Sequence, residues 1–284
     1  MKARSYPAVE VRELWYWYEG PALALQDVNL AIECGDYVAI VGQNGSGKTT
    51  LAKHFNGLLR PKLGSVWLDG ENTAHRTVGE LARRVGYVFQ NPHHQIFGSS
   101  VREELAFGPR NLGLEEAEVQ ERVLEALKAF DLEPFANAPP ALLSFGLKRK
   151  VTLASVYTMR PQVLVLDEPT LGLDRGAARD LMGHVERLHR NGHTIVLITH
   201  DMRLVAECAS RMVVLHQGRL LAYDYTRAVF QRSELLRQAF LVRPQISELA
   251  RDLKPYGVSG DALSVGELYA DLEGLLMRRG REDG

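Results

Sequence analysis

The chain has 284 residues, 45% hydrophobic and 24% charged, as in a globular protein with one sizeable domain and at most a small second one. Its 34 basic residues balance 35 acidic ones, so no overall field attracts it to nucleic acid or to an anionic surface. Cys34 and Cys208 are too few for a disulfide framework, and we expect both to be small core residues in a reducing compartment. No apolar run approaches the roughly 18 residues of a membrane helix, and no signal-peptide segment follows the start. We therefore expect a cytoplasmic chain that reaches any membrane through partner proteins.

Three strands are predicted before residue 42. Residues 8–18 alternate in polarity and end in an aromatic cluster, residues 27–32 form a second strand, and the apolar, β-branched run 37–41 is typical of a buried strand. Tyr18 is a candidate to stack on an adenine ring. The alternative is that the aromatic residues 15–18 only cover an edge strand.

The sequence GQNGSGKT at residues 42–49 is a complete phosphate-binding loop between a predicted strand and a predicted helix, 48–58. Its glycines let successive backbone N–H groups face an anion, and the helix N-terminus adds partial positive charge. We expect Lys48 to reach the β- and γ-phosphates and Thr49 to offer its hydroxyl to Mg²⁺. The alternative, a glycine-rich turn with a solvated lysine, does not account for the flanking strand and helix. The predicted nucleotide-binding residues here are Gly42, Asn44, Gly45, Ser46, Gly47, Lys48, Thr49 and Thr50.

A polar loop follows the next pair of predicted strands, residues 63–70 and 85–89. It begins at Gln90, which is a candidate to orient a water molecule or to contact Mg²⁺, or else only caps the loop. The adjacent His93 and His94 point apart on most backbones, so we expect solvated side chains rather than a metal site.

Three helices are predicted after this loop. The first begins at Ser100 with the capping box Ser100-x-x-Glu103. The helix over residues 115–130 has an apolar face for packing, formed by Val119, Val123, Leu124 and Leu127. The helix that runs to Met159 begins after Ser144, a residue type that caps helix N-termini.

Two carboxylates follow a second apolar run, VLVL at residues 163–166. Such a run is typical of a central parallel strand, and ligands bind at the carboxyl ends of these strands. Asp167 is therefore a candidate to hold Mg²⁺ through its water shell, and Glu168 to position or deprotonate a water molecule. His200 follows another apolar strand, 193–199, and can sense the γ-phosphate from the same edge; a packing role is the alternative.

The last part of the chain is predicted to be a β-hairpin followed only by helices. Residues 211–223 predict a hairpin around Gln217-Gly218, and helices follow over 235–241, 244–253 and 265–277. About fifty residues are too few to form a core alone, so we expect them to pack on the main domain or on another subunit.

Six motifs in order resemble the ATP-binding-cassette ATPase family over about residues 7–230: GQNGSGKT, the Gln90 loop, LSFGL, VLVLDEP, LGLD and ITHD. The resemblance implies an α/β P-loop NTPase cassette with a mixed sheet, an antiparallel β subdomain and an α-helical signature subdomain. It implies a nucleotide-binding domain over residues 1–232, with its helical subdomain at about 91–160, and a helical dimerisation extension over 233–284. It also implies ATP and Mg²⁺ as cofactors, Lys48, Glu168 and His200 as catalytic residues, and Thr49, Gln90 and Asp167 around the metal.

Within the family, the stretches QNPHHQIF, VREELAFGPRNLGL and LVRPQISEL resemble the ATPase subunits of energy-coupling-factor importers of vitamins, cobalt or nickel. This implies an integral membrane coupling subunit and a substrate-binding membrane subunit as partners, at the cytoplasmic face of the membrane. It also implies that Gln95 and its neighbours face the groove that receives a coupling helix. His93 departs from the acid often found at its position in that group.

The signature departs from the family's LSGGQ, because Phe145 and Leu147 replace Gly and Gln while Ser144 and Gly146 remain. A bulky side chain is tolerated near a phosphate only if it points away. In the family, the signature of one subunit completes the ATP site of the other. We therefore expect this chain's phosphate loop to work with a second cassette ATPase, and favour a heterodimer over a homodimer.

Two alternative functions stay open at this stage. One is the ATPase of another type of ATP-binding-cassette importer. The other is a soluble cassette protein acting on nucleic acid or ribosomes, which the near-zero net charge and the lack of a tandem cassette disfavour, so we expect no nucleic-acid partner.

Overall fold

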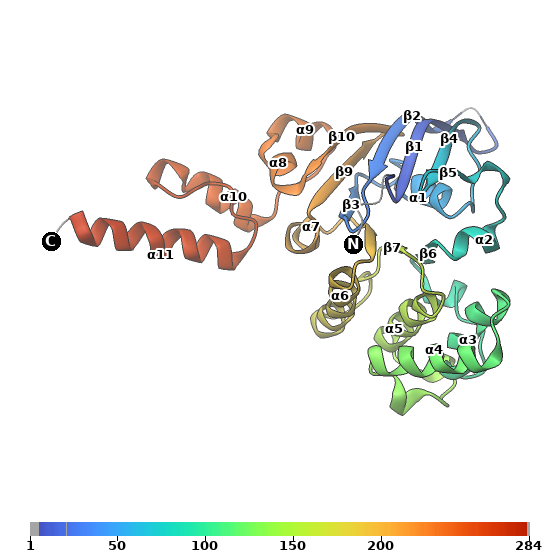
Figure 1. The fold of residues 1–284 in the computed structure, drawn as a ribbon. Helices are drawn as coiled ribbons and strands as arrows, with labels where there is room; N and C mark the ends of the chain where they lie inside the picture. The colour runs from blue at the N-terminus through green and yellow to red at the C-terminus, as the bar shows by residue number, and fades with distance from the viewer. Residues whose placement is uncertain (1–5, 21, 283–284) are drawn as a thin grey trace.

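The computed structural model describes residues 6–20 and 22–282, with side chains described up to residue 277. Its strands lie in two sheets, with helices on both sides of the larger one (Figure 1). No helix among the described residues is long and apolar enough to cross a membrane. The strands are β1 (Val9–Trp17), β2 (Leu23–Ile32), β3 (Tyr37–Val41), β4 (Leu63–Leu68), β5 (Glu71–Asn72), β6 (Val85–Val88), β7 (Val163–Asp167), β8 (Thr194–Ile198), β9 (Arg211–His216) and β10 (Arg219–Tyr225).

The larger sheet has six strands in the order β10-β9-β3-β8-β7-β6. All neighbours are parallel except β9 and β10, which form the predicted hairpin. Strands β3, β8 and β7 are buried along their whole length, as their continuous apolar sequences predict. Their carboxyl ends therefore lie side by side at one edge of the sheet, where the phosphate loop and Glu168 follow.

The smaller sheet is antiparallel, in the order β2-β1-β4-β5, and carries the N-terminal aromatic cluster. Together with one face of the larger sheet it encloses helix α1 (Lys48–Phe55) in a shared core. Strand β3 contributes to the two larger cores, because Val38 and Ile40 face the antiparallel sheet while Tyr37, Ala39 and Val41 face the other helices. The phosphate loop, between β3 and α1, is thus held by two packed layers.

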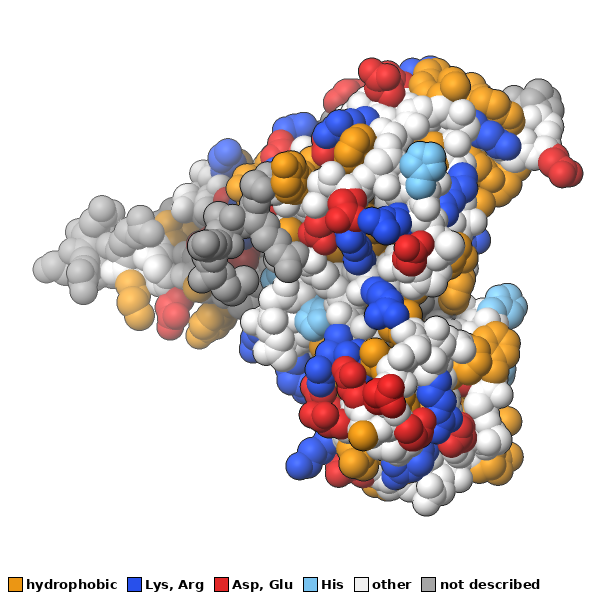
Figure 2. All heavy atoms as spheres, turned by 45° about the vertical axis from the view of Figure 1, so that its right-hand side comes forward, with side chains coloured by type: hydrophobic (Ala, Val, Ile, Leu, Met, Phe, Trp, Pro, Cys, Tyr) orange, Lys and Arg blue, Asp and Glu red, His pale blue; other side chains and the backbone are white. Residues whose placement is uncertain are grey.

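Helices cover the opposite face of the larger sheet. Helices α3, α4 and α5 form a lobe below the sheet, and α6 lies beside this lobe (Figure 1). The helices are α2 (Val78–Ala82), α3 (Val101–Asn111), α4 (Glu116–Ala129), α5 (Phe145–Tyr157), α6 (Arg175–Arg190), α7 (Met202–Cys208), α8 (Thr226–Gln231), α9 (Ser233–Gln238), α10 (Gln245–Asp252) and α11 (Val265–Glu282). On the face in Figure 2, acidic and basic side chains intermingle on the lower lobe.

The C-terminal helices α9, α10 and α11 do not all pack against the same core. Helix α9 packs on the main core, where Leu236 and Ala239 are buried. Helices α10 and α11 instead project away from the sheets (Figure 1) and share a small core of their own. Several apolar side chains on these two helices are exposed, among them Leu249, Val265, Tyr269, Leu276 and Met277.

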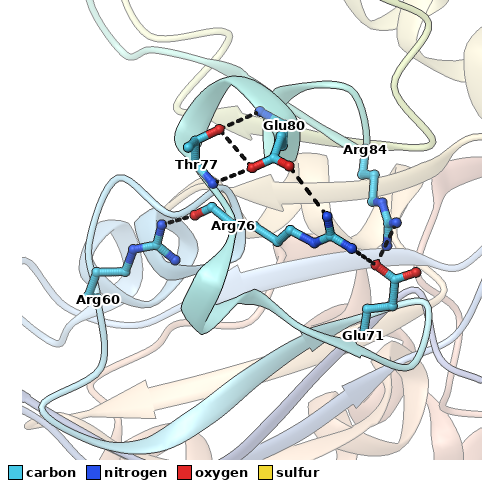
Figure 3. A network of polar contacts seen from close by, with 6 residues as sticks. All are labelled: Arg60, Glu71, Arg76, Thr77, Glu80 and Arg84. Atoms are coloured by element: carbon cyan, nitrogen blue, oxygen red, sulfur yellow. Dashed lines mark hydrogen bonds and ion pairs between the residues drawn. The ribbon is translucent and has the colours of Figure 1, made fainter.

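A polar network fastens the far edge of the antiparallel sheet to α2 (Figure 3). Thr77 and Glu80 form a reciprocal capping box at the start of α2. Arg76 joins Glu80 to Glu71 on β5, and Arg84 also pairs with Glu71 at 2.8 Å. Exposed pairs of this kind contribute little because solvent screens them, so the capping box does more than the ion pairs to fix the start of α2.

Three local predictions were wrong. Cys34 is exposed rather than a core residue, because it lies in the turn between β2 and β3, while Cys208 is partly buried. Leu124 is 56% exposed, and Ala126 takes its place on the buried face of α4. The third is the capping box at α3. Ser100 does cap the helix by accepting from the Glu103 N–H, but the Glu103 carboxylate pairs with Arg110 and not with the Ser100 backbone.

The buried His54 and the partly buried His193 are among the histidines that make the stability of this fold depend on pH. Burial lowers the pKa of His54 and of His193 below the usual 6.5, against a raising effect of their backbone hydrogen bonds. The unfolded chain therefore binds more protons than the folded one near pH 6, and stability falls as pH drops through the unfolded pKa. We expect the urea midpoint to be lower at about pH 5.5 than at about pH 7.5, because the free energy of unfolding falls by at most about 1.4 kcal/mol per pH unit and histidine.

A His54→Gln variant tests this expectation directly, because glutamine does not titrate. Its urea midpoint should depend less on pH than that of the unchanged chain over the same range. An unchanged pH dependence would show that His54 does not contribute to the pH dependence of stability.

Candidate nucleotide site

The phosphate loop has the open geometry that anion binding requires. Gly42, Gly45 and Gly47 all have positive φ, and at Gly47 a Cβ atom would lie 2.7 Å from the Ala24 carbonyl oxygen. Only glycine fits there without strain. Gly47 precedes α1 with no side-chain cap, so the first N–H groups of this helix are open to a ligand.

Lys48 lies in the loop with its ammonium group beside the loop backbone. Its Nζ donates to the carbonyl oxygens of Gly42 and Gln43 at 2.8 and 2.9 Å. Burial lowers the pKa of Lys48, while Glu168 and Asp167 oppose that shift. The side chain is thus a partly desolvated cation facing two carboxylates, a setting in which phosphate charge is strongly attracted.

A pocket of about 450 Å³ lies beside this loop. It brings together residues that are far apart in the sequence, from the end of β1, the phosphate loop, the residue after β6 and the end of β7. The predicted site residues that line it are Tyr18, Asn44, Gly45, Gly47, Lys48, Thr49, Thr50, Gln90, Asp167 and Glu168. Ser46 does not line it; its hydroxyl is buried and turned toward the Cα of Gly42.

Tyr18 lies at the pocket wall and is half exposed. Its hydroxyl lies 3.1 Å from Thr50 Oγ1, and its ring packs edge-to-face against Tyr16. The ring is therefore fixed at the rim and has an exposed surface, as stacking on a base requires. Its role in binding adenine stays a prediction.

Oxygen donors that suit Mg²⁺ meet at the base of the pocket. Thr49 Oγ1 lies 3.1 Å from Asp167 Oδ2, and Gln90 lines the same pocket. Hydroxyl, carboxylate and amide oxygens are the ligands that this hard cation prefers. Tyr87, which the sequence analysis missed, donates its hydroxyl to Asp167 Oδ2 at 2.8 Å from a position 6% exposed. Only the pairing of β6 with β7 places it there.

Glu168 lines the pocket and pairs with His200, an exposed residue that does not itself line the pocket. His200 Nδ1 lies 2.8 Å from Glu168 Oε1, and Thr199 donates to Glu168 Oε2. Glu168 has φ 46°, an unusual conformation for a non-glycine residue, and its N–H bonds to the Ile198 carbonyl. Strained backbone of this kind is common at functional sites. The neighbouring strands β7 and β8 thus bring together two residues that the sequence placed at one edge.

The signature segment lies outside this pocket, at the start of α5. Ser144 is exposed and caps the helix by accepting from the Leu147 N–H. Phe145 turns onto its own chain, where its ring contacts the Cα side of Gly172 and lies 5.2 Å from the guanidinium of Arg149. Leu147 packs against the main core, so neither replaced residue extends freely into solvent.

Gly146 has a packing role in this chain. A Cβ atom at this position would lie 3.1 Å from the Cβ of Ala177 on α6. The close approach of α5 and α6 therefore favours glycine at residue 146, besides any contact with a nucleotide.

Arg149 connects three functional segments, and the sequence analysis did not single it out. It is 2% exposed, and it donates to the carbonyl oxygens of Phe89 at 3.1 Å and Leu171 at 3.2 Å. Phe89 immediately precedes Gln90, and Leu171 lies in the loop after Glu168. Burial lowers the pKa of Arg149, opposed by Asp167 and Glu168. One buried cation thus ties the Gln90 loop and the loop after β7 to the signature helix.

The side chain of Gln95 is half-buried and turns inward, and the expectation that this segment faces a groove for a coupling helix stays a prediction. Its side-chain oxygen accepts from the Phe89 N–H, and its amide nitrogen donates to the Thr152 carbonyl. The exposed residues of this loop are its neighbours, above all Phe97, 72% exposed, which lies beside the half-exposed Phe107. His93 and His94 are also exposed, as predicted.

The sequence model of the ABC transporter family matches residues 25–171, which include the phosphate loop, the signature and both carboxylates of the site. The chain belongs to the ABC transporter family. It is an ATP-binding cassette of the family's ATPase type, and its two sheets and helical lobe are the family's fold.

Relatives of this cassette come from bacteria and archaea. A putative ABC transporter ATP-binding protein of Caldanaerobacter subterraneus is 46% identical over 245 residues; the match covers 86% of this chain but 43% of that protein. The energy-coupling factor transporter ATP-binding protein EcfA of Methanoculleus marisnigri is 45% identical over 254 residues, 89% of this chain and 92% of its own length. The cassette thus spans less than half of the first relative and nearly all of the second.

Solved structures share the fold of the cassette. The CbiO protein of Clostridium perfringens, described as part of the ABC transporter complex cbiONQ, superposes with a TM-score of 0.74 at 36% identity, over 86% of this chain and 99% of that one. A dimeric ATP-binding cassette bound to ADP and Pi in a post-hydrolysis state has a TM-score of 0.68 at 28% identity, over 77% of this chain and 98% of its own.

Replacing Tyr87 by Phe tests the support of Asp167 in this cassette. The change removes the donor to Asp167 Oδ2, and we expect the Mg²⁺ concentration for half-maximal ATPase activity to rise roughly tenfold. Tyr157→Phe is the matched control, because its hydroxyl bonds to Glu125 on the helical lobe. Equal Mg²⁺ dependence of the two variants would contradict a role of Tyr87 at the site.

Proposed function

We propose that this chain is the ATP-hydrolysing subunit of an energy-coupling-factor importer for a vitamin or a cobalt or nickel ion. The pairing of Glu168 with His200 beside Lys48 and Asp167 carries the proposal of hydrolysis. The EcfA protein and the CbiO protein of the cbiONQ complex, both described above as similar, support the choice of transporter. The cargo itself is selected by subunits that this chain does not contain.

The catalytic work that we assign to the site is positioning and charge stabilisation. The open N–H groups around Gly45 and Gly47 and the Lys48 ammonium bind the phosphates. Glu168 accepts a proton from the attacking water, and His200, held on the same carboxylate, stabilises the γ-phosphate end. The adenine ring stacks on Tyr18.

Mg²⁺ is the metal that fits the donor set of Thr49, Asp167 and Gln90. When bound, it neutralises charge on the phosphate oxygens. The protein's own contribution is to hold these oxygen donors in place, through the Tyr87 hydroxyl on Asp167 and through the Arg149 bond to the residue before Gln90.

The partners that we propose are a second cassette, an integral membrane coupling subunit and a substrate-binding membrane subunit, at the cytoplasmic face of the membrane. The exposed pair Phe97 and Phe107 offers the membrane subunit an apolar contact beside the Gln90 loop. We assign residues 1–232 to the nucleotide-binding domain. Residues 233–284 extend it, and the exposed apolar side chains of α10 and α11 support a part in dimer contacts.

Purification from membranes of the source organism in mild detergent, followed by mass spectrometry, tests this function. Recovery of a second cassette with small multi-spanning membrane proteins is the expected result, and the cargo-binding protein recovered identifies the cargo class. Recovery of a periplasmic-type binding protein system would instead indicate another importer class. Recovery of the chain alone or with nucleic acid in a salt-sensitive complex would contradict the proposal.

We further propose that the second cassette is a related but different chain. Phe145 and Leu147 stand where the family has Gly and Gln. Their side chains pack on their own chain, and Leu147 offers a partner's nucleotide no amide group in place of the Gln. The site that combines this chain's Lys48 and Glu168 with the partner's signature is then the competent one. We expect Glu168→Gln in this chain to lower the ATPase rate of mixed dimers far more than the equivalent change in the partner.

Mixed dimers with one replaced glutamate at a time provide the measurement. The homodimer of this chain serves as the control, because it contains the altered signature at both sites and should hydrolyse ATP slowly. Equal loss of ATPase activity from either replacement would rule out the inequality of the two sites.

A further inference from the structure

A cluster of three side chains on the far side of α6 does not belong to the nucleotide site. Asp180 and His184 lie one turn apart on α6, and Asp131 follows the end of α4. One ligand atom from each lies within 4.8 Å of the others. His184 Nε2 is 3.7 Å from Asp180 Oδ1 and 3.8 Å from Asp131 Oδ2. These separations are too long for hydrogen bonds but match atoms that surround one cation at about 2.1 Å.

The decisive feature is the buried state of His184. The residue is 2% exposed, its ring stacks on Phe130 at 5.0 Å, and its Nε2 has no hydrogen-bond partner among the described residues. A buried polar nitrogen without a partner costs free energy. It is aimed at two carboxylates whose side chains are 74% and 51% exposed, so a solvent cation can reach the carboxylates directly while the nitrogen faces them from the buried side.

The second nitrogen of the ring is arranged as in metal-binding histidines. His184 Nδ1 lies 3.1 Å from the Ala129 carbonyl oxygen and also contacts an N–H donor of Arg187. The tautomer that donates its Nδ1 proton to Ala129 is the one that leaves the Nε2 lone pair free for a cation. Burial and the neighbouring charges of Arg187 and Lys150 lower the pKa of His184, against a raising effect of Asp180, which favours the neutral ring that a cation needs.

Two basic side chains adjoin the cluster without occupying it. Lys150 pairs with Oδ2 of Asp180 at 2.6 Å, and leaves Oδ1 facing His184. Arg187 contacts Nδ1 of His184, on the other side of the ring. Their charges oppose a bound cation while the two aspartates attract it, so affinity is expected to be moderate.

We propose that Asp131, Asp180 and His184 form a binding site for a divalent transition metal ion such as Zn²⁺ or Co²⁺. One imidazole and two carboxylates are a donor set of the kind that Zn²⁺ accepts, with water completing the coordination. The ion links the end of α4 to α6. It thereby stabilises the packing of the helical lobe against α6, the helix that follows the loop after Glu168. This site is independent of the nucleotide site and of the transporter assignment.

Cobalt titration of the full-length chain without nucleotide tests the site, because bound Co²⁺ in low-symmetry nitrogen and oxygen coordination absorbs visible light. The chain used carries Cys34→Ser, His93→Gln and His94→Gln, which remove exposed ligands elsewhere. We expect saturable binding of one Co²⁺ per chain, displaced by Zn²⁺, and a Tm higher by about 5 °C at a hundredfold excess of metal over Kd.

Asp131→Asn is the main variant, since Asn tolerates the positive φ of 52° at this exposed residue and keeps the fold. We expect at least a tenfold increase in Kd and loss of most of the Tm shift. His184→Gln should do the same, and Glu133→Gln, an exposed acid two residues away, should change neither quantity. Absence of saturable Co²⁺ binding, or equal affinity in the Asp131→Asn and control variants, would overturn the proposal.

Discussion

Replacing Glu168 by Gln is expected to lower the ATP turnover of the assembled cassette about a thousandfold, in the range typical of a lost general base. Gln keeps the shape of the side chain and a contact with His200, but it cannot take a proton from water. ATP binding is kept, because the phosphate loop and Lys48 are unchanged. We therefore expect an ATP-bound dimer to accumulate, measured by light scattering and by the ATP retained after gel filtration.

Glu207→Gln is the control for this prediction, since Glu207 is an exposed acid on α7 outside the nucleotide pocket. It should leave turnover and the monomer–dimer equilibrium unchanged. A Glu168→Gln variant with normal turnover would remove Glu168 from its proposed role.

Replacing Arg149 by Met should lower kcat on the order of a hundredfold with little change in ATP affinity. Met fills a similar volume but donates nothing to the carbonyls of Phe89 and Leu171, so the loops beside Gln90 and after Glu168 lose their common support. Misplacement of a reacting group by about 1 Å can cost this much. The measurement is steady-state ATPase kinetics together with equilibrium binding of a fluorescent ATP analogue.

Arg149→Lys and Arg160→Met complete this experiment. Lysine has one ammonium group that cannot reach both carbonyls as a guanidinium does, so we expect partial rescue only. Arg160 is exposed and pairs with Glu125 at 2.7 Å, and its replacement should have no effect on kcat. A normal kcat in Arg149→Met would show that the arginine serves stability alone.

Local sequence patterns determined the central strands and the phosphate loop. Continuous apolar residues specify β3, β7 and β8, because such strands are buried on both faces. The glycines of the loop are required by positive φ at three positions. The same reasoning located Glu168 and His200 at neighbouring strand ends, and the hydrogen bond between them confirms that placement; their roles stay predictions.

Predictions that depended on which face of a helix or loop is covered were less reliable. Leu124 fits the helical period but is exposed, because the packing of α4 against α3 and α5 selects Ala126 instead. Gln95 turns inward because Phe89 and Thr152 offer its amide partners that its own segment lacks. Cys34 looked like a small core residue, and the tight turn before β3 leaves it exposed.

The sequence by itself determined the family, the phosphate loop and the carboxylates that follow β7, since each rests on residues adjacent in the chain. Only the tertiary structure decided that Tyr87 bonds to Asp167, that Arg149 joins two loops, and that Phe145 folds onto its own chain. It also decided that His184 meets Asp131. The physical reason is that these contacts join residues from separate elements, and the pairing of strands and packing of helices that creates them has no local sequence signature.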